Sequence, residues 1–255
     1  MGFTYNGISS QSMKIKARLT NWQASPVLRN SFVSIPGKAG VVDFGSNIAE
    51  KVVTVHCNIY PQRSFAALVS ALDDMAEWLN PEHGLRQLVL DDVPDRYFFA
   101  RLTDAVDCER LVLSAGAFDL RFVCPDPHAY ALTDEVFTFN SAGAHEVRRL
   151  KGNTDSEPVY LLKGVIPANA YISIVTNSSE LCVVGMLAVG ETLVIDSGKV
   201  TAKVVNAQGE THRNGLPCLR ELNFPILRKG ANNVNIAVMG ATFTELKIQT
   251  MSRWR

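Results

Sequence analysis

The second half of the chain constrains the fold most strongly, because no helical periodicity runs through it. After about residue 133 the sequence is a succession of short segments in which apolar and polar residues alternate, such as "YISIVT", "ETLVIDS", "KVTAKVV" and "TELKIQTM". Stretches rich in Gly, Asn and Ser, such as "TNSS", "NAQGE" and "KGANN", separate these segments. Alternation with a period of two is typical of half-buried strands. Many short strands at regular spacing predict an antiparallel β-sandwich or barrel for residues 133–255.

The first half, residues 1–132, has a mixed, strand-rich pattern with one convincing helix in "RSFAALVSALDDMAEWLN". Ser64 is a plausible N-cap, and Asn80-Pro81 followed by Gly84 ends the helix. Its predicted apolar face consists of Phe65, Leu68, Val69, Leu72, Met75, Ala76 and Leu79. We therefore expect a mainly β protein of two domains, an α+β domain at 1–132 and an all-β domain at 133–255.

Three further stretches bear on the organisation of the chain. The polar, glycine-containing stretch 140–158 favours a loop or linker near the domain boundary. Asn214-Gly215 is a strong hairpin-turn signal. The final residues, "SRWR", fit either the end of a strand or a return to the first domain.

The stretch "LVLDDVPDRYFFARL" raises the question of an acidic site, since it holds Asp91, Asp92 and Asp95 beside Arg96. Its two ends have strand composition, and "DDVPD" supplies residues that form turns. A metal or acid–base site needs more oxygen ligands or carboxylates in different environments. We therefore predict a hairpin, with the aspartates salt-bridged to Arg96 or to a neighbouring subunit.

Global properties and motifs favour a non-catalytic protein. The formal charge is zero, from 25 basic and 25 acidic residues, so nothing global calls for nucleic acid or a membrane surface. No phosphate loop, H-E-x-x-H or G-x-S-x-G motif is present. The five cysteines form no C-x-x-C pair. Cys124 and His128 are interpreted as structural, because the two prolines between them rule out a regular helix and no second ligand pair lies nearby. The chain shows no signal peptide and no apolar run long enough to cross a bilayer. The five histidines are spread without ligand spacing: His56, His83, His128, His145 and His212.

Six stretches over nearly the whole chain carry a family resemblance through their turns and their order. They are "FTYNGISSQSMKI", "SIPGKAGVVDFGSNIAEKVVTVHCNI", "LVLDDVPDRYFFARL", "GAFDLRFVCPDPHAY", "GETLVIDSGKVTAKVV" and "NFPILRKGANNVNIAV". Their order and spacing resemble those of the distal tail protein (Dit) family of long-tailed, siphovirus-type bacteriophages. The resemblance implies a virion structural protein of the tail tip, made in the bacterial host cytoplasm.

The same resemblance implies a homohexameric ring of N-terminal domains, related to tail tube proteins, with a galectin-like C-terminal sandwich facing outward. Such a ring joins the tail tube protein to the tail-associated hub protein, and the tape measure protein and genome DNA pass through its lumen without sequence-specific binding. It implies no membrane partner, cofactor, metal ion or catalytic residue. We expect the hairpin 88–102 and the loop 34–50 near subunit contacts, with Asp91, Asp92, Asp95, Arg96, Lys38 and Asp43 as the candidate interface residues.

Two other functions stay open from the residues alone. A receptor- or carbohydrate-binding module needs exposed aromatic residues, and Tyr160, Tyr171 and Phe243 are the candidates, although all three fit buried strand positions. The stretch "THRNG" departs from the galactoside-binding pattern of galectins, so we predict no glycan site. A cell-wall hydrolase needs an acid pair in suitable surroundings, which the sequence does not show.

Overall fold

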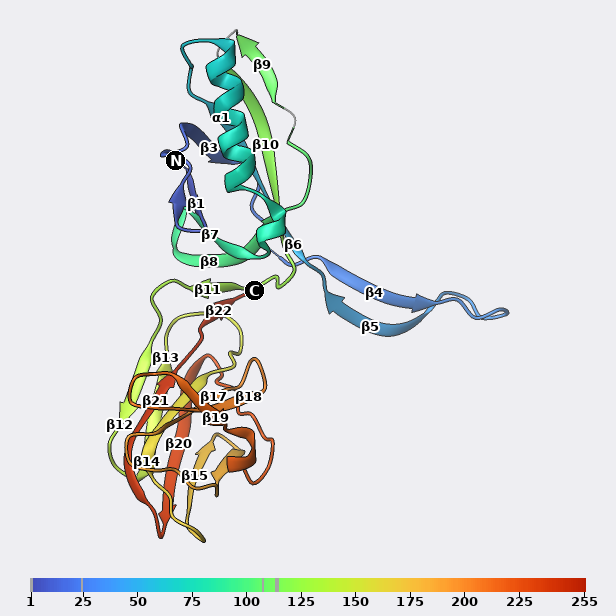
Figure 1. Ribbon diagram of the computed structural model, residues 1–255. Helices are drawn as coiled ribbons and strands as arrows, with labels where there is room; N and C mark the ends of the chain where they lie inside the picture. Colours follow the sequence, from blue (N-terminus) through green and yellow to red (C-terminus); the bar gives the residue numbers. More distant parts are fainter. Residues whose placement is uncertain (1, 24, 107, 113–114) are drawn as a thin grey trace. The chain divides into compact units, whose positions relative to one another are not determined.

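The computed structural model describes residues 2–23, 25–106, 108–112 and 115–255. The chain forms two compact units, unit 1 of Met1–Leu132 with Arg255 and unit 2 of Thr133–Trp254. Each unit is built mainly from antiparallel strands, and α1 is the one α-helix in the described part of the chain (Figure 1). The expectation of a mainly β fold with one helix is confirmed.

Unit 1 has a main sheet with the strand order β2-β1-β7-β8-β10-β6-β3, to which β9 is added beside β10 and β11 beside β8. The strands β4 and β5 pair only with each other. The elements are β1 (Phe3–Tyr5), β2 (Ile8–Ser9), β3 (Ile15–Leu19), β4 (Leu28–Val33), β5 (Val42–Ile48), β6 (Lys51–Ile59), α1 (Phe65–Trp78), the 3-10 helix η1 (Pro81–His83), β7 (Arg86–Leu90), β8 (Val93–Leu102), β9 (Glu109–Val112), β10 (Ala115–Cys124) and β11 (Ala129–Ala131).

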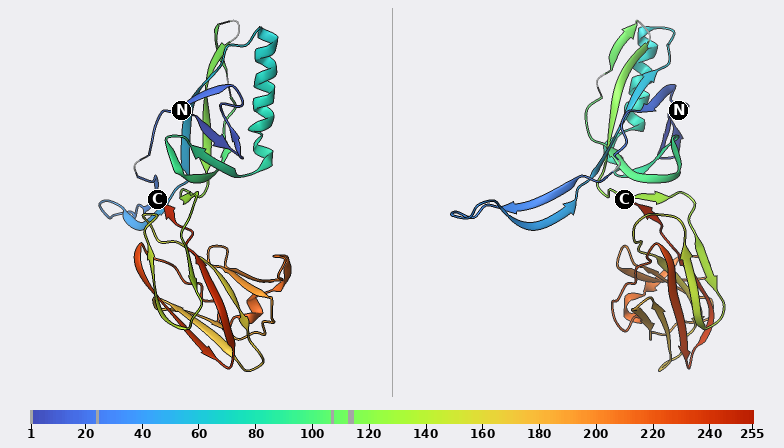
Figure 2. Two further views of the ribbon diagram at one scale, coloured as in Figure 1. Left: turned by 90° about the vertical axis from the view of Figure 1, so that its left-hand side faces the viewer. Right: turned by 180° about the vertical axis from the view of Figure 1, so that it is seen from behind.

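The helix α1 begins where the sequence predicts. The Ser64 hydroxyl accepts a hydrogen bond from the Ala67 amide at 3.2 Å, which satisfies one of the free donors of the first turn. Trp78 fixes the other end to β1: its indole N–H donates to the Tyr5 carbonyl at 3.1 Å, and its ring stacks on Phe3 with centroids 5.5 Å apart. The helix thus lies along the sheet of unit 1 (Figure 2).

Only part of the predicted apolar helix face is buried. Leu68, Met75 and Leu79 are covered by the unit, as expected. Phe65 and Val69 are 50% and 40% exposed, and Ala76 is exposed as well. The amphipathic pattern was therefore correct for the helix but too broad for its contact with the sheet, because the sheet covers one side of the apolar stripe.

The predicted hairpin 88–102 is confirmed as β7 and β8, but its turn is shorter than expected. Leu90 pairs with Val93, so Asp91 and Asp92 alone form the turn. Val93, Pro94 and Asp95 lie in β8, where the pairing register shifts and the missing N–H of Pro94 is tolerated. The prediction that all of "DDVPD" forms the turn was wrong for its last three residues.

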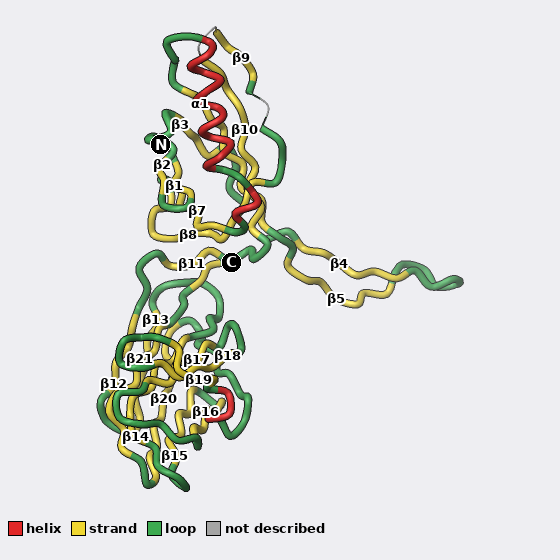
Figure 3. The backbone as a smooth tube through the Cα atoms, in the orientation of Figure 1, coloured by secondary structure: helices red, strands yellow, loops and turns green. Residues whose placement is uncertain are grey.

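The strands β4 and β5 form a two-stranded ribbon that projects from unit 1, and we call them, with the loop 34–41 between them, the arm (Figures 1 and 3). The loop turns at Pro36-Gly37, where Gly37 has φ +82° and the Lys38 amide donates to the Ile35 carbonyl at 3.1 Å. Proline followed by a residue of positive φ is the sequence pattern of a type II turn. The arm is thus a local product of the "SIPGKAG" sequence.

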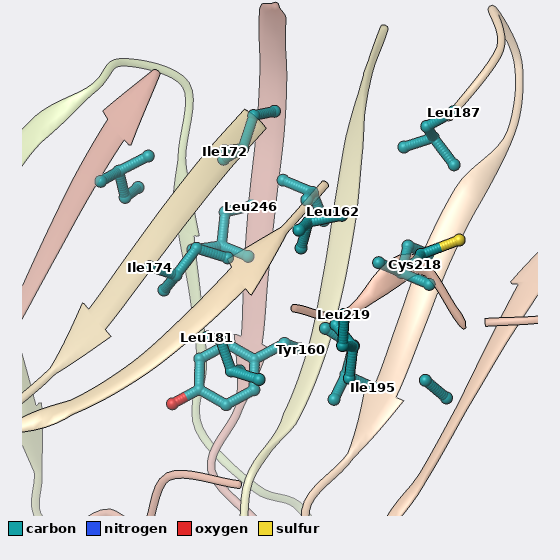
Figure 4. Close-up of a cluster of buried hydrophobic side chains, with 14 of the residues drawn as sticks. Tyr160, Leu162, Ile172, Ile174, Leu181, Leu187, Ile195, Cys218, Leu219 and Leu246 are labelled. Carbon is teal, nitrogen blue, oxygen red and sulfur yellow. The ribbon is translucent and has the colours of Figure 1, made fainter. Parts of the chain in front are cut away.

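Unit 2 is a sandwich of two antiparallel sheets with the orders β12-β21-β14-β17-β18-β19 and β13-β20-β15-β16. Its core draws on both sheets: Tyr160, Leu162 and Leu246 of one face Ile172 and Ile174 of the other (Figure 4). The elements are β12 (Val136–Phe139), β13 (Gly143–Arg149), β14 (Val159–Val165), β15 (Tyr171–Thr176), β16 (Ser179–Val183), β17 (Thr192–Asp196), β18 (Thr201–Val205), β19 (Thr211–Asn214), the 3-10 helix η2 (Leu216–Cys218), β20 (Gly230–Met239), β21 (Thr242–Gln249) and β22 (Arg253–Trp254).

Two sequence predictions in unit 2 are corrected. The stretch 140–158 is not only a loop, since β13 occupies its first half and buries Val147 and Arg149. The Arg149 guanidinium donates to the Thr154 carbonyl, so these two residues of the stretch are folded into unit 2. Asn214-Gly215 does not turn a hairpin: Gly215 has φ −94° and leads into η2, packed too closely against Lys203 for a side chain at that position.

Candidate assembly interface

The arm exposes apolar side chains that its own chain does not cover. Every residue of β4 is exposed, and β5 is half-buried only at its two ends. An isolated two-stranded ribbon is marginally stable in water, and a large exposed apolar surface marks a site of interaction. The arm therefore has the composition of a surface that becomes covered on assembly. Its exposed large apolar residues are Leu28, Phe32, Val33, Ile35, Val41 and Phe44, and Val27 just before β4 is exposed as well.

The register of the arm gathers three apolar residues on one face. Val33 and Val42 are directly paired, and Phe44 follows Val42 by two positions on the same strand. Residues two apart on a strand point to the same side, so Val33, Val42 and Phe44 form one cluster, which we call the apolar arm face. Phe44 is its most exposed member, at 67%.

A bulge follows this cluster directly. Gly45 has φ +95°, and its amide donates to the Asp43 carboxylate at 2.7 Å. Such a conformation strains residues with a Cβ, which explains the glycine. Asp43, one of the predicted interface residues, thus shapes the arm.

The root of the arm is fixed to the sheet by a half-buried cation. The Lys51 ammonium lies 4.5 Å from the centroid of the Trp22 ring and 5.3 Å from that of Phe98. Burial lowers the pKa of Lys51 because it disfavours the charged ammonium. The negative faces of the two rings attract this charge and offset part of the cost of burying it. Beside it the Ala49 amide donates to the Val27 carbonyl at 2.8 Å. These contacts set the direction in which the arm leaves the main sheet of unit 1.

The second uncovered apolar surface of unit 1 lies along α1. Val69, Leu72 and Ala76 follow one another at helical spacing, and we call them the helix flank. The flank opens into an apolar groove of about 480 Å³ between α1 and residues 102–106 with Cys108. The walls of this groove include Leu72, Ala76, Leu79, Leu102, Val106 and Cys108.

The structure places the six predicted interface residues on two separate hairpins. Lys38 and Asp43 belong to the arm and are exposed. Asp91 and Asp92 form the exposed turn between β7 and β8. Their part in a subunit contact stays a prediction.

The remaining predicted pair, Asp95 and Arg96, forms a salt bridge within the chain. The Asp95 carboxylate accepts from Arg96 Nε at 3.0 Å and from Nη2 at 2.9 Å. The predicted salt bridge of this hairpin to Arg96 is therefore confirmed for Asp95. Since the pair is partly exposed, its net stabilisation is small.

Sequence reasoning missed the apolar part of both surfaces. The loop 34–50 was predicted near subunit contacts with Lys38 and Asp43 as its candidate residues, whereas Ile35, Val41 and Phe44 are its exposed large apolar side chains. A usable signal was present: the arm carries apolar residues on both faces, Phe32 on one and Val33 on the other, although no helix or second sheet covers either face.

Polar groups in unit 1 are engaged in ways that explain them structurally. Burial would raise the pKa of the Asp126 carboxyl, but hydrogen bonds from His128 and Tyr130 outweigh burial and lower that pKa to about 2. Burial raises the pKa of the Cys57 and Cys124 thiols to about 12, which leaves them protonated and inert at neutral pH. In the part of the chain that the structure describes, no three His, Cys, Asp or Glu side chains gather as metal ligands.

In unit 2, the side chains of Glu191, Arg213 and His212 form a polar network. The Glu191 carboxylate accepts from Arg213 at 2.9 Å and from the Ala188 amide at 2.9 Å, and it lies 3.2 Å from His212 Nδ1. The hydrogen bond from the Ala188 amide is the main reason that the pKa of Glu191 is lowered. The network ties the loop 184–191 to β19.

The three aromatic candidates for sugar stacking are all covered to some degree. Tyr160 is fully buried in the core, with its hydroxyl 2.8 Å from the Thr176 hydroxyl. Tyr171 is half-buried beneath the Arg220 guanidinium, 5.3 Å from the ring centroid, and Phe243 packs partly on the core. This agrees with the interpretation of these residues as strand core. Among the helices that the structure describes, none is both long and apolar enough to span a bilayer.

Comparison with known proteins shows which domain family and which fold the chain resembles. Residues 5–124 match the model of the phage tail protein RIFT-related domain family, Sipho_tail. No curated protein matches the sequence. The Dit (gp 19.1) protein of phage SPP1, described as a paradigm of the hub adsorption apparatus in phages that infect Gram-positive bacteria, superimposes with a TM-score of 0.76 at 14% identity, over 100% of this chain and 99% of that one. Chains of the phage p2 baseplate in its activated conformation match with TM-scores of 0.53 (with strontium) and 0.50 (with calcium), both at 10% identity over 94% of this chain and 92% of theirs.

These matches agree with the two units. The family match falls within unit 1, and the match to the SPP1 protein extends over unit 2 as well. Residues 5–124 therefore match a phage tail protein RIFT-related domain, and the chain as a whole has the β-rich fold of the SPP1 Dit protein.

Proposed function

We propose that the protein is a ring-forming adaptor at the phage tail tip. Six copies of unit 1 surround a channel through which the tape measure protein and the DNA pass, and the ring joins the tail tube to the hub protein below it. Unit 2 is the outward, galectin-like sandwich. The protein acts by assembly and not by catalysis, after synthesis in the host cytoplasm. The names of the similar structures, a Dit hub protein and a phage baseplate, support this placement.

The observation that carries the proposal is the arm. A ring closes through heterologous contacts, in which each subunit offers one surface and accepts a different one. Unit 1 carries two such surfaces: the exposed arm, and the uncovered apolar residues along α1. A zero net charge permits many copies to pack closely without long-range repulsion.

Labelling of intact phage particles tests the placement. Gold-conjugated antibodies raised against unit 2 are expected at the tail tip in electron micrographs, because that unit faces outward in the proposed ring. An antibody against a capsid protein of the same phage serves as the control. Label along the tail tube or on the capsid, with an unlabelled tip, would contradict the proposal.

Capture experiments test the partners. The purified protein is expected to retain the tail tube protein and the hub protein of its phage together, since a ring has two different faces. Retention of neither partner by a sample shown to be a ring would rule out the adaptor role.

A further inference from the structure

The helix flank is an uncovered apolar surface on an element that otherwise follows the amphipathic rule. Val69 is 40% exposed, Ala76 is exposed and Leu72 is half-buried between them. Exposed apolar residues scattered singly are ordinary, but three in one helical row beside an apolar groove form a continuous surface. This surface needs an occupant with an extended apolar edge.

The groove beside the flank has the size and chemistry for apolar side chains. Its volume is about 480 Å³, and its walls are apolar apart from Thr103 and Asp104. Concave apolar sites of this size bind ligands or partner side chains, and a groove open along a helix fits an extended strand better than a compact ligand.

The apolar arm face has the matching character. Val33, Val42 and Phe44 form one row on a ribbon that is exposed on both sides. The arm cannot occupy the groove of its own chain, because it runs away from the body of unit 1 while α1 lies on that body (Figures 1 and 2). One chain therefore carries both the apolar arm face and an apolar groove that its own arm does not reach. This points to the arm of a second copy as the occupant of the groove.

Charge adds a second match. Beside the helix flank, the polar face of α1 carries Asp73, Asp74 and Glu77, all exposed. The tip of the arm carries Lys38, which is also exposed. Further along the arm, the Asp43 carboxylate accepts a hydrogen bond from the Gly45 amide. A basic tip approaching an acidic helix edge sets the orientation of the contact, as charged rims do at other interfaces.

We propose that the apolar arm face of one copy packs into the groove beside the helix flank of a second copy. This inference rests on the proposed ring and names the surface that accepts the arm. Phe44 enters the groove between Leu72 and Val106, and Lys38 lies over the acidic side of α1. Repeated from copy to copy, this heterologous contact closes the ring.

Cysteine crosslinking between two differently tagged chains tests the contact. Both chains carry Cys108→Ser, which removes the thiol that lines the groove. One chain carries Phe44→Cys and the other Ala76→Cys, and the two are assembled together. Copper phenanthroline in air accepts the two electrons that disulfide formation releases from the thiols. We expect a covalent dimer that contains both tags and that disappears on reduction.

The matched control places the acceptor thiol on the polar side of the same helix. Asp74→Cys replaces Ala76→Cys, at a position that is also exposed, and is expected to give no mixed dimer. Sedimentation of each mixture before oxidation shows whether rings are present. Rings that give no crosslink at Ala76, or an equal crosslink at Asp74, overturn the inference and leave the ring in place. Mixtures that form no ring and no crosslink count against the ring itself.

Discussion

Replacing Phe44 by serine is predicted to weaken assembly without unfolding the protein. A phenylalanine side chain can bury about 200 Å². Phe44 is 67% exposed in the single chain. About 130 Å² is thus available for contact, worth roughly 3 kcal/mol at about 25 cal/mol per Å² if all of it is covered. A contact that covers two thirds of this area contributes about 2 kcal/mol, and its loss weakens each subunit contact about 30-fold.

Sedimentation velocity over a dilution series measures this effect. The Phe44→Ser protein is expected to dissociate at concentrations at least about 30-fold higher than the parent protein. Its melting temperature is expected to be unchanged, because the substituted side chain contributes little to the fold of the single chain. The matched control is Val189→Ser, which removes an 86% exposed apolar residue from unit 2. Equal dissociation midpoints for the two variants would refute the reasoning.

Three further predictions concern the units themselves. Tyr160→Phe is expected to lower the stability of unit 2 by about 1–2 kcal/mol, since it leaves the buried Thr176 hydroxyl without its partner; adding Thr176→Val should restore part of the loss in thermal unfolding, and an unchanged melting temperature for the single variant would contradict this. The lowered pKa of Asp126, about 2, means that its carboxylate stabilises unit 1 fully above about pH 4 and that this contribution disappears as the pH falls towards 2. Acid unfolding of Asp126→Asn should lack that component, and identical acid curves for variant and parent would oppose it. A maleimide at pH 8 should leave Cys57 and Cys124 unmodified in the native protein and modify both in denaturant, as peptide mass mapping can show.

Local patterns predicted the elements well, because the physics that forms them is local. Ser64 caps α1, and alternating residues form the strands of the sandwich. The register and turn of β7 and β8 were less predictable, since Pro94 permits a shift in pairing that depends on the strands nearby.

The candidate interface was less visible in the sequence for a related reason. An apolar residue that faces its own core and one that faces a neighbouring copy have the same identity and the same periodicity. Val69 was therefore predicted as part of the apolar helix face, and only the structure shows that its own chain leaves it and Phe44 exposed. Gly215 failed as a hairpin signal for a similar reason, because its packing against a distant strand overrides the local turn preference.

The solution mass of the full chain tests the central claim most directly. Analytical ultracentrifugation of the purified protein, with negative-stain images of the same sample, is expected to show six times the 28.0 kDa of the single chain and a ring with an open centre. A protein that stays at 28.0 kDa at high concentration, and also in the presence of its tail tube and hub partners, would contradict the ring-forming adaptor.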